Sequence, residues 1–308
     1  MSVSDHSGAS HSHSHASASR NRLALALGVT ATVMALEVVG SYLSGSLALL
    51  ADAGHMLVDS VGLIVALVAA QLMTKPPSKR RTWGFARAEV LSAGLQAGIL
   101  IGLSLFIAYE AIQRLFEPSL VIVGPMVLMG AVGLLGNLIS MLILAGNRND
   151  SLNMKAAFLE VASDALGSVA VLVAALVLWL TGWPYADSVA SLAIAVLIGF
   201  RAVFVLRQSV RILMESVPDG LDVDEVRRRF LASPDVTAVH DLHASTIGTG
   251  INTLTAHVIV SDDCVRDGQT VEVLHQLQDS LRDLPIDVNH VTIQIDSRKH
   301  AGHETLVH

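Results

Sequence analysis

Two pairs of ionisable residues, each with a spacing of four positions, lie inside long apolar runs of the sequence. The first pair is His55 and Asp59, and the second is Glu160 and Asp164. Positions i and i+4 lie one turn apart on the same face of an α-helix, so each pair points in one direction. Imidazole and carboxylate groups are ligands that suit a divalent transition metal. The spacing therefore predicts a metal site built by two helices.

The composition indicates that these helices lie in a membrane. Of 308 residues, 52% are hydrophobic and only 15% are charged, whereas about a quarter are charged in soluble domains. Aromatic residues make up only 4%, which favours a helix bundle over a β-barrel. Ionisable side chains at membrane depth are costly and usually mark a path for ions or protons. We therefore interpret the chain as a membrane transporter of a divalent transition metal.

Six apolar segments are long enough to cross a bilayer, which needs about 20 residues in a helix. Turn-forming stretches separate them, such as Ser44-Gly45-Ser46 and Gly182-Trp183-Pro184. Most basic residues near the segment ends fall on one side of the membrane, which predicts that both termini are cytoplasmic. The segments are residues 22–43, 48–73, 88–114, 120–146, 152–180 and 186–207, within an all-α transmembrane domain of residues 20–211.

This orientation places the two acidic positions at a similar depth. At about 1.5 Å per residue, Asp59 lies roughly 21 Å from the cytoplasmic end of its helix, and Asp164 roughly 18 Å from the cytoplasmic end of its own. The two carboxylates can meet if the helices are neighbours. The alternative is that the residues of the two pairs only hydrogen-bond to one another and hold the helices together.

Other polar or small residues also lie within the predicted spans. Glu37, Asp52 and Asn137 could each form an interhelical hydrogen bond. Asp52 is three positions before His55 and could instead be a station on the exit side of the path. A stripe of glycines four residues apart in the third span predicts close contact with another helix. These glycines are Gly94, Gly98 and Gly102.

The N-terminal tail, residues 1–19, is rich in Ser, His and Ala and is predicted to be disordered because it cannot form a core. Its histidines could capture metal weakly as neutral imidazoles, or they could be incidental in a solvated tail. The net charge of −7 gives no reason to expect a nucleic-acid partner. The single Cys264 excludes an intramolecular disulfide and a multi-cysteine zinc site. The tail histidines are His6, His11, His13 and His15.

After Arg211 the sequence becomes polar and its periodicity changes. Residues 212–298 predict a cytosolic α+β domain of order α-β-β-α-β, with helices on one face of a sheet. A short tail, residues 299–308, follows. The predicted elements are a helix at 223–232, strands at 236–245 and 252–260, a helix at 270–283 and a strand at 288–296.

The cytosolic domain has its own histidines, and they could form a second metal site or be ordinary surface residues. Residues two apart in a strand share a face, so His243 is expected to share a face with Asp241 rather than with His240. An aspartate closes the last predicted strand. These candidates are His240, His243, His257, His275, His290 and Asp296.

Longer stretches of the sequence resemble the cation diffusion facilitators, which are six-helix metal/proton antiporters. The resemblance is strongest to the bacterial cobalt–zinc–cadmium efflux branch, and the matching stretches occur in family order over nearly everything after the tail. They are SLALLADAGHMLVD at 46–59, RTWGFARAEVL at 81–91, NMKAAFLEVASDALGS at 153–168, VPD at 217–219 and VHDLH at 239–243.

The resemblance implies a homodimer with cytosolic domains shaped like metallochaperones and a tetrahedral transport site in each protomer. Zinc is the implied substrate, with cadmium and cobalt as further substrates and protons as the counter-ion. Many zinc-selective relatives have histidine where this chain has Glu160, and the additional carboxylate could broaden selectivity. The implied transport ligands are His55, Asp59, Glu160 and Asp164.

The resemblance also implies a binuclear site in the cytosolic domain, to which zinc could bind as a regulatory ligand. A further ligand position of some relatives falls on Gln294, which is a poor metal ligand. The family motif His-Asp-Leu-His-Ile-Trp is broken here by Ala244 and Ser245. The loop at 74–81 has no acid or histidine, so no site is expected in it. The implied cytosolic ligands are His240, His257, His275 and Asp296.

The charge of the transport site predicts the mechanism. An empty, ionised site places three carboxylates together at membrane depth, which desolvation and mutual repulsion oppose. Metal and protons compete for such ligands, so a site with alternating access could exchange metal for protons, with His55 and at least one carboxylate carrying the proton. The alternatives are a passive metal channel and a sensor or scaffold acting through the cytosolic domain.

Two further expectations concern chemistry and location. The sequence has no His-Glu-x-x-His or nucleophile motif, so an intramembrane enzyme is not expected. The short connection between the fourth and fifth spans lacks the histidine-rich insertion of many eukaryotic relatives, which favours a bacterial inner membrane.

Overall fold

The computed structural model describes the backbone of residues 11–145 and 152–301, and the side chains of residues 25–145 and 158–300. The chain forms two compact units. One contains Met1–Ile64 and Gln96–Phe204, and the other contains Val65–Leu95 and Val205–His308. The predictions for His6 and for the tail after residue 301 lie outside the described residues.

Six helices have the length and hydropathy needed to cross a membrane, which confirms the predicted number of spans. The first begins earlier than expected, because the backbone of residues 11–19 is helical and extends the apolar helix that follows. Adding turns to an existing helix avoids the cost of nucleation, so the prediction of disorder is corrected there. The helices are α1 (His11–Ser44), α2 (Leu47–Met73), α3 (Ala88–Phe116), α4 (Val123–Ala145), α5 (Leu152–Thr181) and α6 (Ala186–Leu213).

Close helix contacts occur at glycines outside the predicted stripe. A Cβ atom at Gly136 on α4 would collide with Val33 on α1. In the stripe itself, a Cβ at Gly94 would lie 3.3 Å from Ser209, but nothing described lies within 4 Å of one at Gly98 or Gly102. Within this chain, the predicted close helix contact is therefore found among the described residues at Gly94 but not at Gly98 or Gly102.

A buried carboxylate fixes the start of α2, the helix that carries His55. Asp187 at the start of α6 is 1% exposed. It accepts hydrogen bonds from the backbone N–H of Leu47 at 2.8 Å and of Ala48 at 3.3 Å, and from the hydroxyl of Ser46. These bonds satisfy free N–H groups of the first turn of α2 and place a negative charge at the positive end of its dipole.

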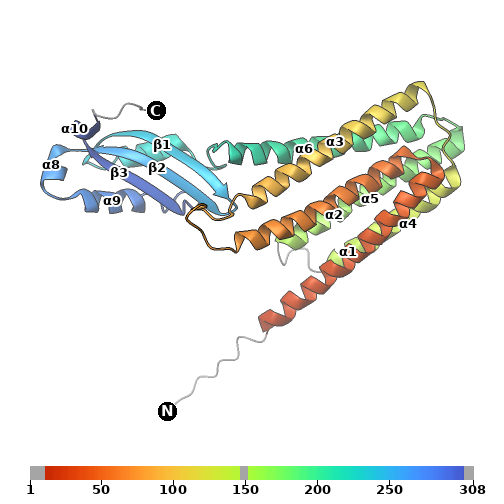
Figure 1. Ribbon diagram of the computed structural model, residues 1–308, viewed down its shortest axis with the longest axis horizontal. Helices are drawn as coiled ribbons and strands as arrows, with labels where there is room; N and C mark the ends of the chain where they lie inside the picture. Colours follow the sequence, from red (N-terminus) through yellow and green to blue (C-terminus); the bar gives the residue numbers. More distant parts are fainter. Residues whose placement is uncertain (1–10, 146–151, 302–308) are drawn as a thin grey trace, which may run out of the picture. The chain divides into compact units, whose positions relative to one another are not determined.

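The predicted α-β-β-α-β order is confirmed, with two short helices added. β1 pairs antiparallel with β2, and β2 pairs parallel with β3, so the sheet order is β1-β2-β3. Figure 1 shows this sheet with α9 along one side. The elements are α7 (Val223–Leu231), β1 (Val236–Gly248), β2 (Ile251–Val260), α8 (Asp262–Arg266), α9 (Thr270–Asp279), β3 (His290–Ser297) and α10 (Arg298–Ala301).

Apolar side chains cover only one face of the sheet. Phe230 of α7 and Leu277 of α9 are buried against Leu254 and Val258 of β2. Because strand residues alternate between faces, His257 points to the opposite face, away from the two helices. α9 ends at Asp279 rather than at 283, with Ser280 as its C-cap.

Candidate metal sites

The two predicted pairs meet between α2 and α5. His55 Nε2 lies 3.0 Å from Asp164 Oδ1 and 3.8 Å from Asp59 Oδ2. His55 is 7% exposed and Asp164 3% exposed, so both side chains are withdrawn from solvent and lipid. Glu160, one turn from Asp164, is half-buried and within electrostatic reach of Asp59 and Asp164. One imidazole and three carboxylates therefore line a single region.

The second nitrogen of His55 faces a fourth carboxylate. Nδ1 lies 3.7 Å from Asp52 Oδ1, and Asp52 is fully buried. A histidine that binds metal through one nitrogen commonly has its other N–H oriented by a carboxylate. Asp52 is placed to orient the ring in this way while Nε2 remains toward Asp59 and Asp164.

The structure adds two residues that the sequence analysis missed. Gln96 on α3 donates a hydrogen bond from Nε2 to Asp59 Oδ1 at 3.0 Å, and its amide occupies the space that a Cβ at Gly62 would need. Arg201 on α6 is an electrostatic neighbour of Glu160. The only sequence signal for Gln96 and for Arg201 was a polar residue within an apolar span. The partners of these two residues depend on which helices are neighbours.

The four residues of the two predicted pairs converge without closing into a compact ligand set. Within the described part of the chain, one group of three potential ligands has all its ligand atoms within 4.8 Å of one another, and it lies in the cytosolic domain.

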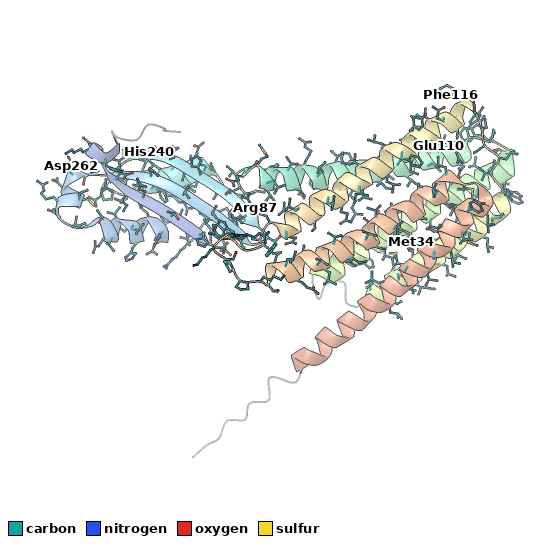
Figure 2. All side chains as sticks on the ribbon, in the orientation of Figure 1. Met34, Arg87, Glu110, Phe116, His240 and Asp262 are labelled. Carbon is teal, nitrogen blue, oxygen red and sulfur yellow. The ribbon has the colours of Figure 1, made fainter. Side chains whose placement is uncertain are left out.

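The compact group is His240, Asp241 and His257. His240 and His257 are directly opposite in the β1–β2 ladder, and their ring centroids are 5.2 Å apart. Asp241 has a φ of 47°, and its Oδ2 lies 3.6 Å from His240 Nδ1. Figure 2 labels His240 on the sheet. Two imidazoles and a carboxylate form a donor set that suits zinc.

A bulge in β1 corrects the predicted faces of this strand. His240 pairs with His257 but His243 pairs with Thr255, so one extra residue of β1 lies between them. Residues 255 and 257 share a face, and therefore His240 and His243 also share one. The prediction that His243 lies on a different face from His240 is wrong, because strict alternation fails at a bulge.

The remaining cytosolic candidates lie in different places. Asp296 is 3% exposed, with Oδ2 3.6 Å from His257 Nδ1, and both its oxygens accept from the Gln294 amide at 3.0 and 3.2 Å. His275 is exposed on α9, on the helical side of the sheet. One protomer thus brings His240, His257 and Asp296 near one another, and His275 does not join them within the chain.

Other predicted residues of this domain have structural roles. His290 contacts the ring of Trp83 edge-on, with the centroids 4.7 Å apart. Cys264 is buried, and burial raises the pKa of its thiol, which disfavours the thiolate that metal binding requires.

Six membrane-length helices with ionisable residues between two of them, followed by a small α+β domain, define a membrane transporter of cations. The family model described as the cation efflux transmembrane domain matches residues 23–214. The model described as the cation efflux protein cytoplasmic domain matches residues 218–298. The chain belongs to the cation efflux family.

Relatives match over most of their length. The metal cation efflux system protein CzcD of Cupriavidus metallidurans is 43% identical over 94% of this chain and 90% of its own. The zinc transporter ZitB of Escherichia coli is 39% identical over 87% and 84%. The cadmium, cobalt and zinc/H(+)-K(+) antiporter of Bacillus subtilis is 38% identical over 87% and 86%.

A solved structure is also similar to part of the chain. It is the metal-bound C-terminal domain of the CzcD transporter from Cupriavidus metallidurans, with 37% sequence identity. The match covers 25% of this chain and 99% of the solved one, with a TM-score of 0.22.

Proposed function

We propose that this protein exports zinc, and also cadmium and cobalt, from the cytoplasm in exchange for protons. The observation that carries the proposal is the contact of His55 Nε2 with Asp164 Oδ1 at 3.0 Å between two spanning helices. Asp59 and Glu160 complete a set of one nitrogen and up to three oxygen ligands, which zinc accepts. The names of the relatives support the same group of metals.

Charge balance makes the exchange obligatory. Three carboxylates in a region of low dielectric are unstable without a cation. A divalent ion provides that charge in the loaded site, and protons provide it in the empty site. Because ligands must lose their protons to bind metal, a site that opens alternately to each side moves metal outward and protons inward. His55 and at least one carboxylate carry returning protons.

The cytosolic site acts as a regulatory zinc site in this proposal. His240, His257 and Asp296 hold the ion from one protomer, and His275 comes from a second copy of the chain. The exposure of His275 on α9 supports an intermolecular role. Zinc supplies a cross-link between the two copies, and this cross-link shifts the population toward one arrangement of the dimer. The homodimer lies in a bacterial inner membrane with both termini in the cytoplasm.

The test uses proteoliposomes that contain a zinc indicator. Zinc uptake should be faster with an acidic lumen than with equal pH on both sides, because protons leaving the vesicle drive zinc entry. A protonophore that collapses the gradient should remove the acceleration. Uptake at the same rate in all three conditions would indicate a passive channel, and no uptake would leave only a sensor or scaffold role.

A separate variant tests the proton role of His55. The exchange mechanism predicts that His55→Ala loses both zinc uptake and zinc-coupled proton flux. If this variant retained uptake with undiminished coupling, His55 would not be a proton carrier.

A further inference from the structure

A buried acidic residue on α1 takes no part in the site described above. Glu37 is fully buried, and among the described residues neither of its carboxyl oxygens has a hydrogen-bond partner. No ion pair joins it to a lysine or arginine within the described part of the chain. An unpartnered carboxyl in the interior of a membrane domain is costly and calls for a functional explanation.

A glycine on α4 provides the space for this carboxyl. A Cβ atom at Gly133 would collide with Glu37 Oε1 and would lie 3.1 Å from Ser168 Oγ. The carboxyl therefore lies directly against the backbone of α4, next to the Ser168 hydroxyl of α5. This niche is closed to solvent, and only a residue without a side chain at position 133 leaves room for it.

Hydrogen bonds connect the niche to Asp52, which lies beside the transport site. Asn137 Nδ2 donates to Ser168 Oγ at 3.3 Å, and Ser168 Oγ donates to Asp52 Oδ2 at 3.3 Å. Asp52 in turn faces His55 Nδ1 at 3.7 Å. The niche thus adjoins the metal site without containing any of its four proposed ligands.

The charged groups that act on Glu37 are all acidic. Asp52 on α2 and Asp164 on α5 are its electrostatic neighbours, and the neutral Ser168 hydroxyl of α5 lies beside it. Among the described residues, no hydrogen-bond donor reaches either carboxyl oxygen of Glu37. With no donor and no cation to stabilise a carboxylate, the neutral acid is the form that this niche accommodates.

We propose that Glu37 is a proton carrier of the exchange, at a site separate from the metal ligands. When the transport site is empty, Glu37 holds a proton. When a divalent ion binds at His55 and Asp164, its two positive charges favour the carboxylate, the O–H bond breaks, and the proton passes to water on the side to which the site is open. This inference rests on the proposed function and deepens it.

A metal ion is the competing occupant of the niche. Glu37, Asp52 and Asn137 would offer only oxygen ligands, which suit hard cations rather than zinc. The geometry therefore favours a proton.

The experiment counts protons released as zinc binds. Purified full-length protein in a weak buffer at pH 7 is titrated with zinc to saturation while a pH indicator reports the released protons. Glu37→Gln keeps the shape of the side chain but cannot ionise, so it should release about one proton fewer per protomer with zinc affinity within about threefold of wild type. Glu117→Gln, at an exposed position after α3, is the matched control and should release the wild-type number.

The outcomes separate this proposal from the function on which it rests. If wild type releases protons and Glu37→Gln releases the same number, Glu37 is not a carrier. If Glu37→Gln loses zinc affinity tenfold or more, Glu37 is a ligand or a structural residue, and the proposal is overturned. If the wild type itself releases no protons, the antiport mechanism fails. Elution of both variants at the wild-type volume shows that each retains its fold.

Discussion

At the residue scale, His55 is the point where the proposed ligands of two helices meet. Its Nε2 contacts Asp164 and faces Asp59, and its Nδ1 faces Asp52. The four-residue spacing predicted the two pairs, because helical geometry fixes which residues of one helix share a face. Gln96 could not be predicted from spacing, since its contact with Asp59 depends on the packing of α3 against α2.

Glu160 is the residue where selectivity can be tested. An additional carboxylate makes the site harder than one with two imidazoles, so Glu160→His should favour zinc over cobalt. We expect the ratio of cobalt to zinc uptake in proteoliposomes to fall by roughly tenfold, which corresponds to about 1.4 kcal/mol. If the relative uptake rates of zinc, cadmium, cobalt, nickel and manganese were the same in Glu160→His as in the wild type, Glu160 would not contact the transported ion.

Gln96 positions a ligand in this account. Its amide donates to Asp59, and loss of a group that orients a metal ligand typically lowers metal affinity by about 10- to 100-fold. Gln96→Leu should therefore weaken zinc binding, measured by calorimetry, to this extent. Gln113→Leu, on an exposed part of the same helix, should bind zinc as the wild type does. Equal affinities for the two variants would contradict the role of Gln96.

At the element scale, glycines allow helices that carry buried polar residues to approach one another closely. A Cβ at Gly167 on α5 would collide with Asp52 Oδ1 on α2, so this glycine permits the contact of the two helices that carry the site. The sequence indicated six spans because each is a long apolar run. It could not show which glycines face a neighbour, and of the evenly spaced stripe at Gly94, Gly98 and Gly102 only Gly94 has a close contact among the described residues of this chain.

A glycine whose Cβ position is occupied by a neighbouring helix can be compared directly with one whose Cβ position is open. Gly167→Ala should force α2 and α5 apart and reduce zinc transport tenfold or more, because helix interfaces with small residues tolerate little extra volume. Gly98→Ala should leave transport unchanged, since nothing described lies within 4 Å of its Cβ position. Zinc uptake, normalised to the amount of folded protein, measures both. If Gly98→Ala reduced zinc uptake and Gly167→Ala did not, the roles assigned to these two glycines would be reversed.

At the scale of the whole molecule, the chain combines one candidate metal site in its membrane helices with another on a separately packed sheet. The order of elements in the sheet domain followed from periodicity and turn residues. The bulge at Asp241 did not, because one residue with a positive φ shifts the alternation of a strand without a strong sequence signal. The way in which two copies of the chain assemble does not follow from one sequence either. The proposed role of His275 depends on this assembly.

Complementation between copies tests the shared cytosolic site. His240→Ala and His275→Ala should each abolish zinc binding at this site in a homodimer. In a mixed dimer, one cytosolic site contains both alanines and the other contains neither, so about half of the wild-type binding should return. Zinc per dimer, measured in a background lacking the four transport ligands, gives the result. Mixed dimers that bind no zinc would show that His275 is not contributed by the partner.

The most direct test of the account measures zinc uptake by protein in which the four transport residues are removed together. His55, Asp59, Glu160 and Asp164 are replaced by alanine, and uptake into proteoliposomes with an acidic lumen is compared with that of the wild type and of protein-free vesicles. We predict uptake at the level of protein-free vesicles, with the variant still inserted and eluting as the wild type does. Zinc uptake at the wild-type rate would contradict the assignment of the transport site to α2 and α5.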